Sequence, residues 1–276
     1  MGLRVNTNVA SINAQRNLQN TTNRLGRSLE RLSSGLRITR ASDDAAGLAI
    51  SEKFRAEIRS LQQAQRNAND GISLLQVAEA ALNETSSILI RLRELAIQSA
   101  NGTLGSAERQ ALNGEFRDLI NEINRIAEVT EFNGINILNS AGVSITFQVG
   151  TENTSNDRIT VSGANARASS FGLDTSVNIL TQSAARGVLG TLDSAVQTVA
   201  SLRARFGTAQ NRLEATIRSI AVAVENTSAA ESRIRDVDVA SETAELTRNQ
   251  VLQQAGVAVL SQANLSTQIA LQLLQP

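Results

Sequence analysis

Residues 54–99 read FRAEIRSLQQAQRNANDGISLLQVAEAALNETSSILIRLRELAIQS. Within this stretch an apolar residue returns at every seventh position: Phe54, Leu61, Ala68, Leu75, Leu82, Leu89 and Ala96. A second, mixed apolar line runs beside it: Ile58, Ala64, Ile72, Ala78 and Leu92. A seven-residue repeat of this length predicts one long helix that packs along partner helices. The pattern stops at SANGTLG, residues 99–105, where two glycines follow each other closely.

Helical periodicity predicts four further helices. Residues 3–38 carry a narrow leucine stripe, and Ser106 offers an N-cap to a shorter helix that ends at the turn residues 133–140. From about Ala185 another heptad series begins: Leu192, Val199, Phe206, Leu213 and Ile220. Residues 229–240 look like a junction, and a last helix is expected from about Ser241 to Leu274.

Residues 143–162 change period. Val143, Ile145, Phe147 and Val149 alternate with polar residues, and alternation returns at Ile159 and Val161 after a polar loop. This pattern predicts a β-hairpin. Residues 163–183 are rich in Ser, Ala and Asn and are expected to be mostly irregular.

These segments predict a mainly α fold, a long antiparallel helical bundle or coiled-coil rod with paired N- and C-terminal helices and a small β-hairpin region at the far end. A nearly one-sided terminal helix is marginal in water, so each needs the other or neighbouring copies. The expected domains are paired terminal helices at 1–42 and 229–276 with a spoke linker at 33–42, a three-helix rod at 43–139 and 184–228, and a short variable region at 140–183.

The composition excludes several kinds of function. The chain has 276 residues, no His, Cys, Trp or Tyr, and 26 basic residues that balance 26 acidic ones. Imidazole and thiol catalysis and the common zinc sites therefore have no side chains to form them. No apolar run reaches the ~20 residues of a membrane span, and the first residues lack the apolar core of a secretory signal. We expect no cofactor, no metal site, no enzymatic activity and no membrane insertion.

The adjacent carboxylates Asp43 and Asp44 raise the question of chemistry. An enzymatic role needs a pocket and further polar groups, and no partner motif appears; a metal at the pair alone would leave most of its coordination to water. The favoured interpretation is structural. Ser42 is expected to be the N-cap of the long helix, with both acids in the first turn, after a spoke that begins at Gly35.

Arginines concentrate in residues 4–40, and residues from 231 onward carry five acids against three arginines. A nucleic-acid site would show interleaved aromatics or a recognition motif, and neither is present. We therefore expect no nucleic acid as partner. The basic segment is expected to pack on the acidic C-terminal segment or on neighbouring copies, with Arg31 and Arg37 important for assembly.

Four blocks of the sequence resemble the bacterial flagellin family, in the order that the family shows. They are RLSSGLRITRASDDAAGLAIS (31–51), ANDGISLLQVAEAALNETSSILIRLRELAIQSANGT (68–103), NEINRIAEVTEFNGINIL (121–138) and LTRNQVLQQAGVAVLSQANLSTQIALQLL (246–274). The resemblance covers residues 1–140 and 184–274, and it identifies a short flagellin without large variable outer domains.

The resemblance implies a structural subunit that self-assembles into the helical flagellar filament used for motility. In this family the terminal helices pair as an inner tube around a channel, so the assembly residues here would include Leu246, Leu260 and Ile269. Subunits are exported unfolded through that channel to the extracellular filament. Implied partners are copies of the chain itself, an export chaperone at the C-terminal helix, and the filament cap and junction proteins.

The resemblance also implies a host partner. In flagellins that animals detect, the helix around RLRELAIQ (91–98) contributes to the surface read by Toll-like receptor 5, and Arg91, Leu95 and Glu115 match those positions. The alternative is that these charges meet a neighbouring subunit along the filament axis, and both roles are compatible.

A flagellar hook–filament junction protein is the alternative function, and a metallopeptidase is rejected. A flagellar hook–filament junction protein shares the terminal helices but does not form long filaments. A metallopeptidase of the kind some flagellins carry needs H-E-x-x-H, and this chain has no histidine.

Overall fold

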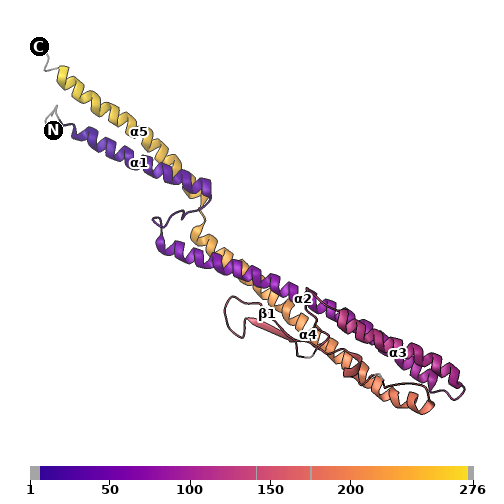
Figure 1. Cartoon of the computed structure of the whole chain (residues 1–276). Helices are drawn as coiled ribbons and strands as arrows, with labels where there is room; N and C mark the ends of the chain where they lie inside the picture. The colour runs from indigo at the N-terminus through magenta and orange to yellow at the C-terminus, as the bar shows by residue number, and fades with distance from the viewer. Residues whose placement is uncertain (1–6, 141, 175, 273–276) are drawn as a thin grey trace. The chain divides into compact units, whose positions relative to one another are not determined.

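The computed structural model describes residues 7–140, 142–174 and 176–272, with side chains up to residue 265. Its helices are α1 (Val9–Ser34), α2 (Ala45–Ser99), α3 (Ser106–Val129), α4 (Gln182–Arg235) and α5 (Val239–Gln272) (Figure 1). Strands β1 (Ser144–Gln148) and β2 (Arg158–Ser162) and the 3₁₀ helix η1 (Ala168–Phe171) lie between α3 and α4. The predicted mainly α fold with one small hairpin is confirmed. No described helix is both long and apolar enough to cross a membrane.

The chain forms two compact units. Unit 1 contains residues 1–57 and 226–276, and unit 2 contains residues 58–225. Helices α2 and α4 contribute residues to both units. The predicted domain boundaries lie at 42/43 and 228/229 instead. They were drawn by the expected role of each segment in a polymer, and they stay a prediction.

In unit 1, α1 and α5 run antiparallel, side by side (Figure 1). The Asn8 side chain donates to the carbonyl of Ala263 at 2.8 Å, near the start of α1, and Arg31 contacts Glu242 at 3.6 Å near its end. Much of what the pair buries is polar: Ser11, Ser28 and Asn249. Among the described side chains of α1 and α5, Ala14 is the only buried apolar one. Because burial of apolar surface is the main stabilising force, this pair has little core of its own.

Unit 2 contains the hydrophobic core. Most of its heptad positions are fully or almost fully buried on both long helices, whereas Leu61 is half-buried. The buried ones are Ala68, Leu75, Leu82, Leu89 and Ala96 on α2, and Leu192, Val199, Phe206 and Leu213 on α4. The two helices are antiparallel, since Glu79 pairs with Arg203 at 3.6 Å and Arg93 with Asp193 at 2.6 Å. Helix α3 adds Phe116, Ile120 and Ile123 to the same core.

The predicted hairpin is confirmed, with Ile145 opposite Val161 and Phe147 opposite Ile159. Its position within unit 2 differs from the expectation of a far end. Phe147 lies beside Gly71 in the middle of α2, where a Cβ on this glycine would approach the ring to 3.1 Å. The hairpin lies there because its apolar face needs the surface that α2 and α4 offer at this level.

Asparagines of α3 hold the irregular segment that follows the hairpin. The side-chain oxygen of Asn113 accepts from the Ile179 N–H, and that of Asn124 accepts from the Ala168 N–H, both at 2.9 Å. These bonds satisfy backbone groups that have no helix or sheet partner.

Two predicted element boundaries outside the linker between α1 and α2 are wrong. Helix α4 continues through the expected junction at 229–240 as far as Arg235, because no Gly or Pro interrupts residues 229–235. The break covers residues 236–238, and the Asp238 side chain accepts from the Ala240 N–H to start α5. Ser106 is the first residue of α3 and Gly105 its N-cap, without a side-chain bond.

Candidate functional site

The linker between α1 and α2 is tied to the break between α4 and α5. Gly35 ends α1 in the left-handed conformation, with φ of 72°. Its carbonyl accepts from the Val237 N–H at 3.0 Å, and the Arg37 N–H donates to the Arg235 carbonyl at 2.6 Å. The two connections therefore pair as a short antiparallel bridge. The predicted spoke at 33–42 is therefore one of two segments of this chain that pair with each other, the second being the break at residues 236–238.

The start of α2 differs from the prediction, in which Ser42 is the N-cap. Helix α2 begins at Ala45, and the Asp44 side chain accepts from the Gly47 N–H at 2.8 Å, so Asp44 is the capping residue. Neither acid lies in the first turn. Sequence reasoning misplaced the cap because Ser and Asp cap helices equally well. It also missed Gly47, where a Cβ would meet the Asp44 carboxylate at 2.4 Å and the Ile38 side chain at 2.8 Å.

Asp43 closes the linker instead of starting the helix. Its Oδ2 accepts from the Thr39 hydroxyl at 3.0 Å and from the N–H groups of Thr39 and Arg40 at 3.2 Å each. Burial alone would raise the pKa of Asp43, but these hydrogen bonds and the charge of Arg31 outweigh it and hold the pKa below the ordinary value. Asp43 is thus an ionised structural acceptor. Among the described residues no three His, Cys, Asp or Glu gather to hold a metal.

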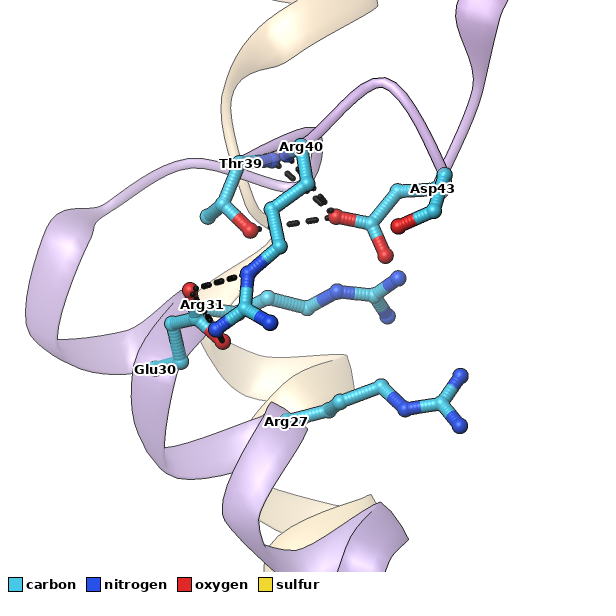
Figure 2. A pocket seen from close by; sticks show the side chains of 7 residues that line it. Arg27, Glu30, Arg31, Thr39, Arg40 and Asp43 are labelled. Carbon is cyan, nitrogen blue, oxygen red and sulfur yellow. Dashed lines mark hydrogen bonds and ion pairs between the residues drawn. The ribbon is translucent and has the colours of Figure 1, made fainter.

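A polar hollow of about 300 Å³ lies beside this linker (Figure 2). Arg40 binds both carboxylate oxygens of Glu30 at 2.8 Å, while Arg27 and Arg31 extend into the same space from α1. Ser42 lines the hollow as well. Among the described residues Arg27 forms no ion pair, and the three arginines that line the hollow outnumber its two acids, Glu30 and Asp43.

Of the two arginines predicted to act in assembly, Arg31 pairs with Glu242 of α5, whose side chain is only 13% exposed. This contact agrees with the expected packing of the basic segment on the acidic one. Arg37 donates to the carbonyl of Ile234, so it binds backbone instead of an acid. Their role between copies stays a prediction.

Of the three apolar residues of α5 that were predicted to act in assembly, the structure describes the side chains of two. Leu246 and Leu260 are half-buried, and the side chain of Ile269 lies outside the described residues. A larger set of apolar side chains on α1 and α5 is exposed: Val9, Ile12, Leu29, Val239, Val251, Leu252, Val257, Val259 and Leu265. Exposed apolar residues on these helices agree with the expectation that each terminal helix needs the other or neighbouring copies.

The three residues of the predicted receptor surface differ in exposure to solvent. Arg91 donates to Glu115 of α3 at 2.8 Å and to Glu94 at 3.0 Å, and these side chains are exposed. Leu95 is fully buried in the core of unit 2. Leu95 therefore faces the core of unit 2, as Leu92 and Ala96 do, and its role at a receptor surface stays a prediction.

Two family descriptions match the chain. Residues 5–142 match the bacterial flagellin N-terminal helical region, and residues 189–274 match the bacterial flagellin C-terminal helical region. The chain is 45% identical to a flagellin of Halalkalibacterium halodurans over 98% of its own length and 99% of the relative's. It is 44% identical to the flagellar filament 33 kDa core protein of Treponema phagedenis, with the same two coverages.

Solved structures are similar as well. The crystal structure of Bacillus cereus flagellin is 34% identical, with a TM-score of 0.51, over 56% of this chain and 88% of that one. The structure of a putative flagellar hook-associated protein of Vibrio parahaemolyticus has a TM-score of 0.59 over 70% of this chain and all of that one. At 16% identity, this second likeness shows a shared fold alone.

Proposed function

The chain belongs to the bacterial flagellin family and is a structural, non-enzymatic subunit of the flagellar filament, and we propose how its parts serve assembly and export. Helices α1 and α5 form the polymerising element.

The exposed apolar set on α1 and α5 carries this proposal. Val251 and Val259, for example, are each 59% exposed on a helix pair that buries little apolar surface. Water-exposed valines and leucines gathered on one element mark an interaction site. Neighbouring copies of α1 and α5 would cover them, which supplies the core that the isolated pair lacks.

We assign the predicted layers accordingly. Residues 1–42 and 229–276 form the inner tube around the channel, and residues 43–139 and 184–228 form the outer tube. The described part of residues 140–183 contains the hairpin, η1 and short irregular segments, which fits a flagellin without a large outer domain.

Export in an unfolded state through the channel to the extracellular filament fits the same features. The chain has no Cys, so no disulfide resists unfolding, and unit 1 has few buried apolar contacts to lose. A chaperone that holds residues 246–274 before export would cover the exposed Val251, Leu252, Val257 and Val259. The cap and junction proteins of the filament are its further proposed partners.

A Toll-like receptor 5 surface would use Arg91 and Glu115, with Leu95 acting only through the core. Because Arg91 already binds Glu115 and Glu94, a receptor or a neighbouring subunit would meet this charge cluster as a unit.

Assembly of the purified chain tests the proposal. Filaments are induced with sulfate or phosphate, which strengthens apolar burial, and are followed by sedimentation and electron microscopy. We expect long filaments from the unmodified chain and none from Val251→Asn/Val259→Asn. Val222→Asn, at a valine of unit 2 that is equally exposed, is the matched control and assembles. An unmodified chain that stays monomeric would favour the junction protein, whereas assembly of the double variant would exclude these valines from the interface.

A further inference from the structure

An acidic face with an apolar centre lies on α2 in unit 2. Asp70, Val77 and Glu84 are exposed and recur every seventh residue, so neighbours are separated by about 10.5 Å along the helix axis. The seven-residue line 68, 75 and 82 is buried, and positions 70, 77 and 84 lie about half a turn from it. The acidic face therefore points away from the core.

A basic groove lies on α4 of the same unit. Arg205 and Arg212 are both exposed and border a hollow of about 260 Å³ between α4 and β2. Phe206, which is almost fully buried, and Ala209 line its apolar part, and Thr160 and Ser162 of β2 line the other side. The two arginine Cα atoms are also separated by about 10.5 Å along their helix.

Neither set of charges is neutralised within the described subunit. The ion pairs of the described residues involve none of Asp70, Glu84, Arg205 and Arg212, although neighbouring residues of both helices are paired. Separate charge runs are ordinarily solvated. Here each charge set flanks an apolar centre, Val77 at 39% exposure in one case and the hollow over Phe206 in the other.

The face and the groove lie at the same level of unit 2. Glu79 pairs with Arg203 and accepts from Gln210, and Gly71 lies beside Leu213. Residues 70–84 of α2 therefore run alongside the part of α4 that bears Arg205 and Arg212. An unrelated basic partner would need only the acidic face, and an unrelated acidic partner only the groove. Both features on one unit favour a second copy of this chain.

We propose that the acidic face of one copy docks into the basic groove of the next, an inference that rests on the proposed polymerisation. Val77 enters the apolar part of the groove beside Ala209, between the two arginines, and Asp70 and Glu84 meet Arg205 and Arg212 from the two ends. With Val77 centred, each acid lies about 5 Å beyond an arginine Cα along the axis, which the long arginine side chain spans. Two different patches meet, so the contact is heterologous and repeats from copy to copy.

Charge reversal in the full chain tests this contact. Asp70→Lys/Glu84→Lys and Arg205→Glu/Arg212→Glu each change only exposed residues, and far-UV circular dichroism verifies that the helices persist. We expect each variant alone to need about tenfold more protein for assembly at the lowest sulfate concentration that still induces filaments of the unmodified chain, because two attractive pairs become repulsive. An equimolar mixture of both variants, and the chain with all four reversals, are expected to assemble at close to the unmodified concentration.

Glu131→Lys/Arg186→Glu is the control for charge reversal elsewhere in unit 2, since both residues are exposed, and like the fourfold variant it keeps the net charge. It is expected to assemble like the unmodified chain. Unimpaired assembly of either double reversal overturns the contact, as does failure of the mixture and the fourfold variant to recover, or equal failure of the control. Polymerisation of the unmodified chain is measured separately, so loss of this contact leaves the filament function standing.

Discussion

The guanidinium of Arg235 donates to Oε1 of Glu52 at 2.8 Å and joins the last residue of α4 to the early turns of α2. Hydrogen bonds from Arg235 and then from Arg55 lower the pKa of Glu52 below its ordinary value. The pair lies in unit 1, next to the backbone bridge between Leu36 and Asp236. The linker between α1 and α2 and the break between α4 and α5 are thus hydrogen-bonded to each other, and the Arg235–Glu52 pair adds a contact between the adjoining helices.

Replacing Gly35 with Ala is expected to destabilise α1. The residue has φ of 72°, where a Cβ costs about 1–2 kcal/mol. Gly26→Ala, in the interior of the same helix and with nothing within 4 Å of the new Cβ, is expected to stabilise it by about 0.5–1 kcal/mol. Denaturant unfolding of the monomer, followed by circular dichroism, measures both. Equal effects of the two changes would contradict the capping role of Gly35.

The stability of the joint is expected to depend on pH through Asp43. The pKa of this carboxyl is lower in the folded chain than its ordinary 3.8, so its stabilisation is present above that value and is lost as the pH falls through the folded pKa. Unfolding free energies of the unmodified chain and Asp43→Asn, measured from pH 7 to pH 2, should converge at the acid end. Thr39→Val removes the hydroxyl donor and should reduce the difference; identical profiles for all three chains would exclude this role.

Charge reversal at either Arg31 or Glu242 is expected to destabilise the α1–α5 pair, and reversal at both residues together is expected to restore its stability. Arg31 and Glu242 lie 3.6 Å apart, so Arg31→Glu or Glu242→Arg alone replaces an attractive pair with like charges. Each change is expected to destabilise the α1–α5 pair by about 1 kcal/mol, the upper range for a partly exposed ion pair. The double variant restores opposite charges. Melting of unit 1 and the salt dependence of assembly report the coupling, and additive effects of the two single changes would argue against it.

Leu95→Ala and Arg91→Ala are expected to differ in kind. Truncation of the fully buried Leu95 should cost about 2–5 kcal/mol of unfolding free energy. Arg91→Ala removes exposed ion pairs and should cost less than about 1 kcal/mol. If the charge cluster is a receptor surface, Arg91→Ala lowers receptor activation by folded monomer, whereas Leu95→Ala does so only where it unfolds the chain. Unchanged signalling by Arg91→Ala would remove this site.

Heptad arithmetic predicted the burial of Leu75, Leu82 and Leu89 on α2, and of Val199 and Phe206 on α4. It succeeded because a regular helix converts sequence spacing directly into faces. The cap of α2 was assigned to Ser42 instead of Asp44, since local capping signals are degenerate between neighbouring polar residues. The full burial of Leu95 was not predicted, because a family motif does not say which of its positions face the core.

The sequence by itself determined the helices, the hairpin, the family and the absence of imidazole and thiol chemistry, because these depend on local periodicity and on the residues present. Only the tertiary structure decided that Gly35 and Val237 pair, that Glu52 meets Arg235, and that the acidic face of α2 lies level with the groove of α4. These relationships join residues far apart in the chain. Their geometry depends on how the antiparallel helices align, and no local pattern encodes that alignment.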